Sequence, residues 1–124
     1  MTVGTIDLTT LADGVIGVQL NRPPVNALNP VFLAEIDRAV AALTADDAVR
    51  AVVLSGAGKT LSGGMDLKEL LDFSAADQKA MVDGLNRTFA GLYGFPKPLV
   101  CAANGPGIAG GLFFILVSDY CVAS

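Results

Sequence analysis

The 124-residue sequence contains no histidine, and this absence removes several kinds of chemistry at once. Catalytic arrangements that pair a serine or a cysteine with a histidine cannot be built from this sequence. The commonest metal ligand is missing as well, so no metal site is expected. The only two cysteines, Cys101 and Cys121, stand in apolar runs without CxxC spacing, and we expect buried free thiols.

Charged residues are scarce at 16%, whereas hydrophobic residues make up 52% of the sequence. The net charge of −4 and the scattered positions of the eight lysines and arginines argue against a nucleic-acid-binding protein. The apolar excess indicates burial against a partner subunit, a further part of the chain or a membrane. The first residues show no signal peptide, and with free thiols this favours a cytoplasmic protein.

One stretch, Leu99–Ser118, carries no charge and is long enough to span a bilayer. However, Asn104-Gly105-Pro106-Gly107 would break a transmembrane helix near its first third. The uninterrupted apolar part, Leu112–Val117, is too short to cross a membrane. We therefore expect a buried strand, a turn and a buried helix, with a membrane segment as the less favoured alternative.

Strand-like and helix-like patterns alternate along the chain, and this alternation predicts an α/β fold with parallel strands. Two β-prone runs, Thr5–Thr10 and Val15–Asn21, indicate a hairpin. Further strands are expected at residues 50–55, 99–103 and 120–123. Because no linker or low-complexity segment interrupts the chain, residues 1–124 are expected to form one domain. The last strand has barely begun at Ser124, so we expect this domain to be truncated.

Three helices are expected between these strands. Asn29 before Pro30 is typical of a helix start, and apolar residues recur at helical spacing to about Leu43. Ser74 and Asp77 resemble a capping box for a second helix. Its apolar face would consist of Met81, Leu85, Phe89 and Leu92. The third helix would cover residues 110–118, with Phe113, Phe114 and Leu116 as core residues.

The stretch Gly56-Ala57-Gly58-Lys59-Thr60 resembles the end of a phosphate-binding P-loop. A P-loop requires a further glycine where this sequence has Val53, inside an apolar run that predicts a strand. It also requires a helix that begins at the Lys-Thr pair, but Leu61-Ser62-Gly63-Gly64 follows, and paired glycines start helices poorly. A P-loop is therefore not expected. A plain surface turn and a different use of free backbone N–H groups are the alternatives.

Two glycine-rich turns follow predicted parallel strands at corresponding places in the alternation. They are Ser62-Gly63-Gly64-Met65-Asp66 and Asn104–Gly111. Ligands of open α/β sheets bind at such carboxyl ends, and glycine lets a ligand approach the backbone closely. Two free N–H groups that converge on one carbonyl oxygen form an oxyanion hole. Two ordinary structural turns are the alternative.

Four segments resemble the crotonase family, also called the enoyl-CoA hydratase/isomerase family. In chain order they are NRPPVNALN, VRAVVLSGAGK, KTLSGGMDLKE and NGPGIAGGLFFILVSDY. The order and spacings fit over nearly the whole chain, which is similar to the N-terminal half of family members. The resemblance implies a spiral of repeated ββα units, truncated before the C-terminal helices. It also implies an acyl-CoA thioester substrate of fatty-acid metabolism and an enolate intermediate, with no cofactor beyond the coenzyme A of the substrate. A homo-oligomer, either a trimer or a dimer of trimers, is implied as well.

The resemblance also implies roles for individual residues. The backbone N–H groups of Met65 and Gly110 would form the oxyanion hole. Residues in contact with the CoA portion would be Val25, Ala27, Leu28, Gly63, Asp66 and Leu67. Pro106 and Phe113 would line the acyl pocket.

A catalytic base is not evident. In family hydratases the first of two catalytic glutamates lies three residues after the second oxyanion glycine, and that position here is Phe113, which cannot transfer a proton. Isomerases with one carboxylate place it on a segment that would begin beyond Ser124. Asp66 fits a helix cap better than a base, and Asp119 and Ser62 are expected to be structural. We therefore expect an enzyme of the lyase or isomerase type whose 124-residue piece has low activity. A CoA-thioester-binding fragment without turnover is the alternative.

Overall fold

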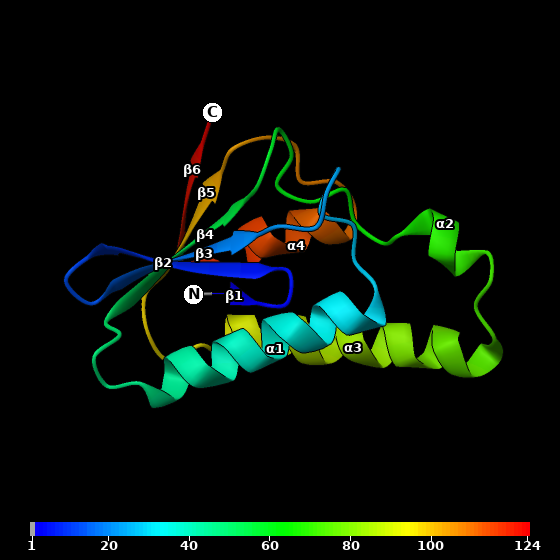
Figure 1. Cartoon of the computed structure of the whole chain (residues 1–124), viewed down its shortest axis with the longest axis horizontal. Helices are drawn as coiled ribbons and strands as arrows, with labels where there is room; N and C mark the ends of the chain where they lie inside the picture. Colours follow the sequence, from blue (N-terminus) through cyan, green and yellow to red (C-terminus); the bar gives the residue numbers. More distant parts are fainter. Residues whose placement is uncertain (1) are drawn as a thin grey trace.

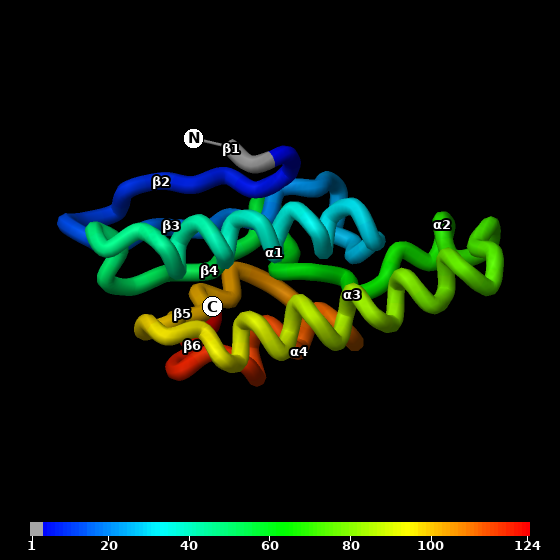
Figure 2. The backbone as a smooth tube through the Cα atoms, turned by 90° about the horizontal axis from the view of Figure 1, so that it is seen from below, coloured from blue at the N-terminus to red at the C-terminus, as the bar shows by residue number. Residues whose placement is uncertain are grey.

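The computed structural model describes residues 2–124, with only the backbone described for Thr2 and Val3. Its strands form one six-stranded sheet in chain order, and helices α1 and α3 lie side by side along one face (Figure 1 and Figure 2). The strands are β1 Thr2–Val3, β2 Ile6–Ala12, β3 Val15–Leu20, β4 Ala51–Gly56, β5 Leu99–Ala103 and β6 Tyr120–Ala123. The helices are α1 Pro30–Ala45, α2 Leu67–Leu70, α3 Ala75–Tyr93 and α4 Gly110–Leu116.

The sheet is antiparallel over its first three strands and parallel from β3 to β6. This arrangement confirms the predicted hairpin and the α/β class. Strands β5 and β6 have the predicted bounds, whereas β4 is displaced by one residue and β2 continues to Ala12. Strand β1 is too short for an alternating pattern to indicate it. The parallel pairing brings the carboxyl ends of β3, β4 and β5 to the same edge of the sheet.

The hydrophobic core lies between the sheet and the helices. Val52 and Leu54 of β4 are buried in this core at 4% and 2% exposure. Val53 lies on the opposite face of the strand and is only half-buried. The three successive apolar residues of β4 therefore do not give full burial on both faces.

The two predicted helix starts are confirmed by hydrogen bonds. The Asn29 Oδ1 accepts from the Phe32 N–H at 2.7 Å, and Pro30 opens α1. At α3 the Ser74 hydroxyl accepts from the Asp77 N–H at 3.1 Å, and the Asp77 carboxylate accepts from the Ser74 N–H at 3.0 Å. The expected apolar face of α3 is buried at Met81 and Leu92 and half-buried at Leu85 and Phe89.

Helix α4 is shorter than predicted, and two of its expected core residues are not in the core. Phe114 is 0% exposed, but Phe113 is 48% and Leu116 61% exposed. A short helix presents only one stripe to the sheet, which here consists of Gly111 and Phe114, three residues apart. Phe113 and Leu116 lie on another stripe, which an apolar composition alone does not reveal.

The two cysteines are direct partners in the register of β5 and β6. Both are free thiols, as predicted; Cys101 is buried and Cys121 is half-buried. Burial, together with the neighbouring Cys121, raises the pKa of the Cys101 thiol to about 11.

Short segments joined by isolated parallel bridges complete a repeated ββα arrangement. After β3, β4 and β5 the chain runs through residues 25–28, 61–65 and 106–108, and these segments pair in parallel through the bridges Leu28–Met65 and Ser62–Gly107. Each unit therefore contains a long strand, a short bridged segment and at least one helix. These are the repeated units that the resemblance to the crotonase family implied.

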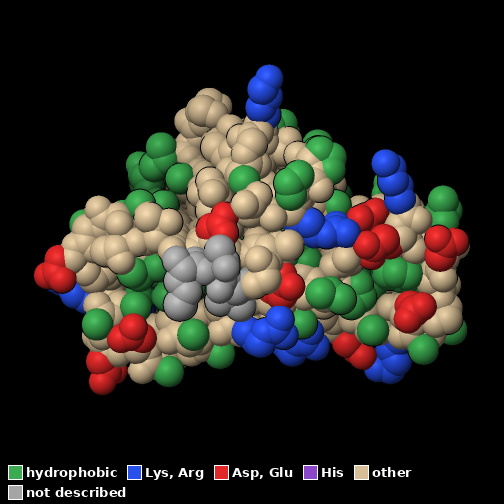
Figure 3. Space-filling model, in the orientation of Figure 1, with side chains coloured by type: hydrophobic (Ala, Val, Ile, Leu, Met, Phe, Trp, Pro, Cys, Tyr) green, Lys and Arg blue, Asp and Glu red, His purple; other side chains and the backbone are tan. Residues whose placement is uncertain are grey.

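The uncharged stretch 99–118 divides into β5, a turn and α4, as expected. Among residues 2–124 no helix has both the length and the apolar character needed to cross a bilayer. On the face seen in Figure 3, lysine and arginine side chains are spread over several places and do not form a single basic patch.

Candidate active site

The two glycine-rich turns meet beyond the carboxyl ends of β4 and β5. The Ile108 N–H donates to the Ser62 carbonyl at 3.0 Å, and the Leu61 N–H donates to the Pro106 carbonyl at 3.1 Å. Gly64, at φ +85°, lies against the second turn. A Cβ added to it would lie 2.7 Å from the Ile108 oxygen and 3.2 Å from the Gly110 nitrogen. Only glycine allows the two turns to approach this closely.

Met65 is fixed on one side by a pair of backbone hydrogen bonds. The Leu28 N–H donates to the Gly64 carbonyl at 2.7 Å, and the Asp66 N–H donates to the Leu28 carbonyl at 2.8 Å. In a parallel bridge of this kind, the N–H of the central residue points away from the partner strand. The Met65 N–H therefore faces away from Leu28.

Gly110 is the first residue of α4, where backbone N–H groups lack a partner within the helix. The next two N–H groups, of Gly111 and Leu112, donate to the Ile108 and Ala109 carbonyls. Within residues 2–124, neither the Gly110 N–H nor the Met65 N–H has a hydrogen-bond partner. Two backbone N–H groups without a partner thus lie on adjacent turns.

Asn26 and Ser62 hold the first turn from inside. Asn26 is 1% exposed, with φ +53°, and its amide donates to the Ala57, Thr60 and Leu61 carbonyls at 3.1–3.2 Å. The Ser62 hydroxyl donates to the Asn26 carbonyl at 2.8 Å and accepts from the Gly64 N–H at 3.2 Å. Ser62 is 0% exposed, which agrees with the expected structural role.

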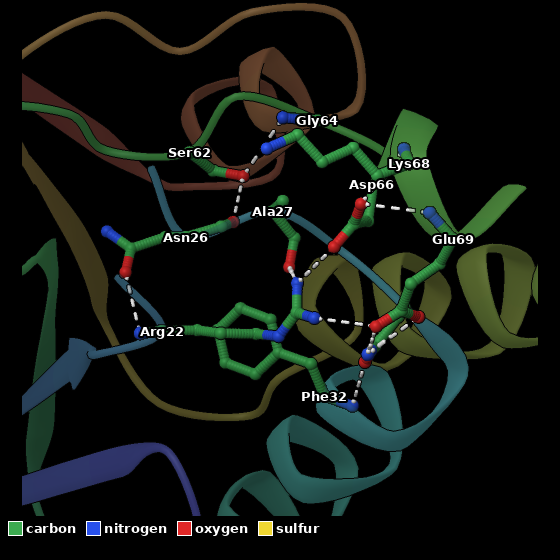
Figure 4. A network of polar contacts seen from close by, with 10 residues as sticks. Arg22, Asn26, Ala27, Phe32, Ser62, Gly64, Asp66, Lys68 and Glu69 are labelled. Carbon is green, nitrogen blue, oxygen red and sulfur yellow. Dashed lines mark hydrogen bonds and ion pairs between the residues drawn. The ribbon is translucent and has the colours of Figure 1, made fainter. Parts of the chain in front are cut away.

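Asp66 is a helix N-cap, as predicted. The short helix that it caps, α2, was not among the three expected helices. One carboxylate oxygen accepts from the Lys68 and Glu69 N–H groups, and the other accepts from Arg22 at 2.9 Å (Figure 4). Burial raises the pKa of Asp66, but the hydrogen bond from Arg22 and those from the two backbone N–H groups together outweigh it and lower the pKa below its usual value. Asp66 is therefore an ionised cap with both oxygens occupied. Asp119 is also structural, since it accepts from the Leu99 N–H at 2.7 Å.

The residues expected to contact CoA come together along the first turn. The Gly63 N–H donates to the Val25 carbonyl at 2.8 Å, and a Cβ on Gly63 would lie 3.2 Å from a Val25 methyl. Val25 and Leu67 are 40% and 68% exposed, and Ala27 is half-buried. Leu28 is only 1% exposed, with its side chain beside Gly110.

The two residues expected along the acyl pocket lie on the second turn and on α4. Pro106 is exposed and accepts two backbone hydrogen bonds, from Leu61 and Ser62. Phe113 lies one helical turn beyond Gly110 and packs against Phe89, with ring centroids 5.4 Å apart. Among the described residues, no cluster of three or more acidic or cysteine side chains is placed to hold a metal ion.

Two residues that organise the site, Arg22 and Asn26, received no role from the sequence. Both stand in NRPPVNALN, the segment that resembles the CoA-contacting loop. The available signal was an arginine and an asparagine beside two prolines, where the chain cannot continue as a strand. This signal indicates a turn but not the residues that the turn contacts. Asn26 contacts Ala57, 31 residues away, and Arg22 contacts Glu69, 47 residues away.

Comparison with known proteins identifies the family. The enoyl-CoA hydratase/isomerase profile matches residues 10–124. A Rhizobium meliloti protein named "Probable enoyl-CoA hydratase" is 38% identical over 114 residues, which cover 86% of this chain and 41% of that protein. The mitochondrial Delta(3,5)-Delta(2,4)-dienoyl-CoA isomerase of Mus musculus is 34% identical over 131 residues, which cover 94% of this chain and 40% of the mouse protein.

Solved structures give the same result. The crystal structure of an enoyl-CoA hydratase from Bacillus anthracis matches with a TM-score of 0.91 at 26% identity, covering 96% of this chain and 47% of that one. An enoyl-CoA hydratase/isomerase from Xanthobacter autotrophicus matches with a TM-score of 0.87 at 35% identity, covering 98% and 46%. The chain thus spans less than half the length of these relatives, and the predicted crotonase-like fold is confirmed. The chain belongs to the enoyl-CoA hydratase/isomerase, or crotonase, family.

Proposed function

We propose that this chain supplies the oxyanion hole of an acyl-CoA enzyme of the hydratase/isomerase type. The observation that carries the proposal is the pair of free N–H groups, of Met65 and Gly110, on turns that touch at Gly64. A thioester carbonyl oxygen between them would accept both hydrogen bonds. The names of the relatives, which include an enoyl-CoA hydratase and a dienoyl-CoA isomerase, support an acyl-CoA thioester as the substrate class.

The chemistry follows from where charge develops. Removal of the proton next to the thioester carbonyl leaves an enolate, whose negative charge rests mainly on the oxygen. Two fixed N–H donors stabilise that charge without reorganisation, and loss of one such donor typically costs about 3–4 kcal/mol of transition-state stabilisation. Val25, Ala27 and the Gly63–Leu67 turn would lie along the CoA portion, with Pro106 and Phe113 along the acyl group.

The proposal assigns the proton transfer to a carboxylate outside these 124 residues. Phe113 has no proton to transfer, and Asp66, the carboxylate next to Met65 in the chain, is held by Arg22 and by the N–H groups of α2. An ionised carboxylate held in this way is a weak base, because its lowered pKa disfavours proton uptake. We therefore expect little turnover from the 124-residue chain itself.

Acetoacetyl-CoA tests the oxyanion hole directly, because it can present an enolate. The 124-residue chain would be titrated with it, with free CoA as the ligand control and circular dichroism to confirm folding. We expect tighter binding than free CoA and a rise in enolate absorbance. Equal binding of both ligands by a folded sample would overturn the proposal.

Two variants make the experiment specific for the backbone donors. Met65→Ala changes the side chain but keeps the N–H, so the enolate signal should remain. Gly110→Pro removes the N–H at the first position of a helix, which proline tolerates, so the signal should fall in a folded protein. An enolate signal that survives Gly110→Pro would contradict the role of Gly110.

A further inference from the structure

The Arg22 guanidinium connects two segments that are distant in the sequence, residues 22–27 and 66–69 (Figure 4). Its Nη1 donates to the Ala27 carbonyl at 2.7 Å and to the Asp66 carboxylate at 2.9 Å, and its Nη2 donates to Glu69 at 2.8 Å. The Arg22 and Asp66 side chains are only 23% and 18% exposed. Solvent and salt therefore screen this pair less than a surface ion pair.

The network continues to the starts of two helices. Both carboxylate oxygens of Glu69 accept from the Asn29 amide, at 3.0 and 3.1 Å, and Asn29 itself caps α1. Asp66 caps α2 with its other oxygen. Arg22 thereby ties the start of α1 to the start of α2.

Met65 itself makes none of these bonds but lies next to Asp66, a member of this network. The two groups that bind Nη1, Ala27 and Asp66, are the chain neighbours of Leu28 and Met65, which form the parallel bridge. One nitrogen of Arg22 thus holds a residue on each side of the bridge that orients the Met65 N–H. Without the guanidinium, the Asp66 and Glu69 carboxylates would lose their shared cation, and Ala27 would lose its donor.

We propose that Arg22 is a positioning residue that sets the direction of the Met65 N–H through Ala27 and Asp66. This inference rests on the proposed function, since it assigns Met65 to the oxyanion hole. The fork geometry of arginine is essential, because one planar group must satisfy a carbonyl and two carboxylates at once.

The test compares Arg22→Met and Arg22→Lys in the 124-residue chain. Arg87→Met is the matched control, because it removes an exposed arginine–aspartate pair, with Asp37, that lies on the helices α3 and α1. The first readout is amide hydrogen exchange at Leu28 and Asp66, whose N–H groups form the bridge. The second is the affinity for acetoacetyl-CoA by enolate absorbance, with free CoA as the ligand control.

We expect Arg22→Met to accelerate exchange at Leu28 and Asp66 by roughly tenfold or more, while amides of β4 keep their protection. The affinity for acetoacetyl-CoA should fall by about tenfold or more and that for free CoA much less, because small displacements of catalytic groups have large effects. Arg22→Lys should give an intermediate result, since an ammonium acts as one point charge. Arg87→Met should change neither readout.

Unchanged exchange in a folded Arg22→Met would overturn the inference. Lost protection with unchanged enolate affinity would also overturn it, because Arg22 would then only stabilise the fold. If wild type shows no enolate signal while Arg22→Met loses protection at both amides, the proposed function fails and the positioning of the bridge stands. If Arg22→Met does not fold, the same readouts on Arg22→Lys decide.

Discussion

The Met65 turn and the Gly110 turn lie against each other but are held by different means. Polar side chains hold the first turn: Arg22 donates to its Asp66 carboxylate, and the Asn26 amide donates to the Leu61 carbonyl just before it. Within the turn, the Ser62 hydroxyl accepts from the Gly64 N–H. At the start of α4, by contrast, Ala109 forms no side-chain cap and has φ +51°. Apart from the side chain of Asn104 at its start, the second turn is held by backbone hydrogen bonds and by the close fit of glycines against Ser62 and Lys59.

This difference means that the two turns should fail in different ways. A network of side chains loses individual bonds when one residue is changed, and the rest can compensate. The glycines of the second turn pack directly against backbone atoms of Ser62 and Lys59. An added side-chain atom cannot be accommodated there, because backbone atoms cannot move aside as a flexible side chain can. Substitutions can therefore separate the two kinds of support.

The largest effect is expected from Gly111→Ala in the second turn. The added Cβ would overlap the Ser62 carbonyl oxygen and lie 2.8 Å from the Ser62 carbonyl carbon, and both atoms are backbone. We expect the free energy of unfolding to fall by about 3 kcal/mol, at the upper end of overpacking costs, and the enolate signal to disappear. Urea unfolding followed by circular dichroism measures the first effect.

Gly91→Ala on α3 is the control, since a Cβ there meets no atom within 4 Å. It should stabilise the helix by roughly 0.5–1 kcal/mol, because alanine loses less conformational freedom than glycine. A Gly111→Ala variant as stable as wild type would show that the second turn can shift, and the contrast between the turns would be wrong.

A smaller effect is expected from removing the side-chain amide of Asn26 or of Asn104. Asn26→Ala leaves three carbonyls without their donor in a buried site, so unfolding should become easier by about 2 kcal/mol. Asn104 is exposed and bridges the Gly56 N–H and the Gly58 carbonyl. Because the bond to Gly58 is exposed and water can replace it, Asn104→Ala should cost less than Asn26→Ala, about 1 kcal/mol.

Chemical denaturation of both asparagine variants under the same conditions gives the comparison. If both variants lost the same free energy of unfolding, burial of the Asn26 amide would contribute nothing to stability. The first turn would then not depend on its internal side chains.

The fold was more predictable than the site because its signals are local. Alternating and helical apolar spacings gave β5, β6 and the starts of α1 and α3, where caps such as Asn29 and Ser74 act within three residues. The exposure of Phe113 and Leu116 was not predictable, because it depends on which stripe of α4 meets the sheet. Composition does not encode that orientation.

The candidate site shows the same division. Glycine pairs after two strands indicated both turns, because glycine lets another group approach the backbone closely. The Arg22 and Asn26 contacts join residues 31 to 47 positions apart, and no local pattern predicts them. The Gly110 turn was therefore visible in the sequence, whereas the support of the Met65 turn required the structure.

The smallest expected effect concerns the charge of Asp66. Its pKa is lowered in the folded protein, so the ionised form adds stability above the usual aspartate pKa of about 3.9, and that stability is lost as the pH falls through the lowered folded value. Asp66→Asn keeps a good cap but removes the charge that Arg22 binds. We expect it to be less stable than wild type by about 1 kcal/mol at pH 7, with the difference shrinking below about pH 4. Urea unfolding at a series of pH values from 7 to about 3 measures this difference.

Asp83→Asn is the control, because it breaks the exposed ion pair with Lys79. It should lower the free energy of unfolding at pH 7 by almost nothing. If Asp66→Asn behaves like Asp83→Asn, the ion pair with Arg22 is no stronger than a surface pair, and the first turn depends on Asn26 and Ser62 instead.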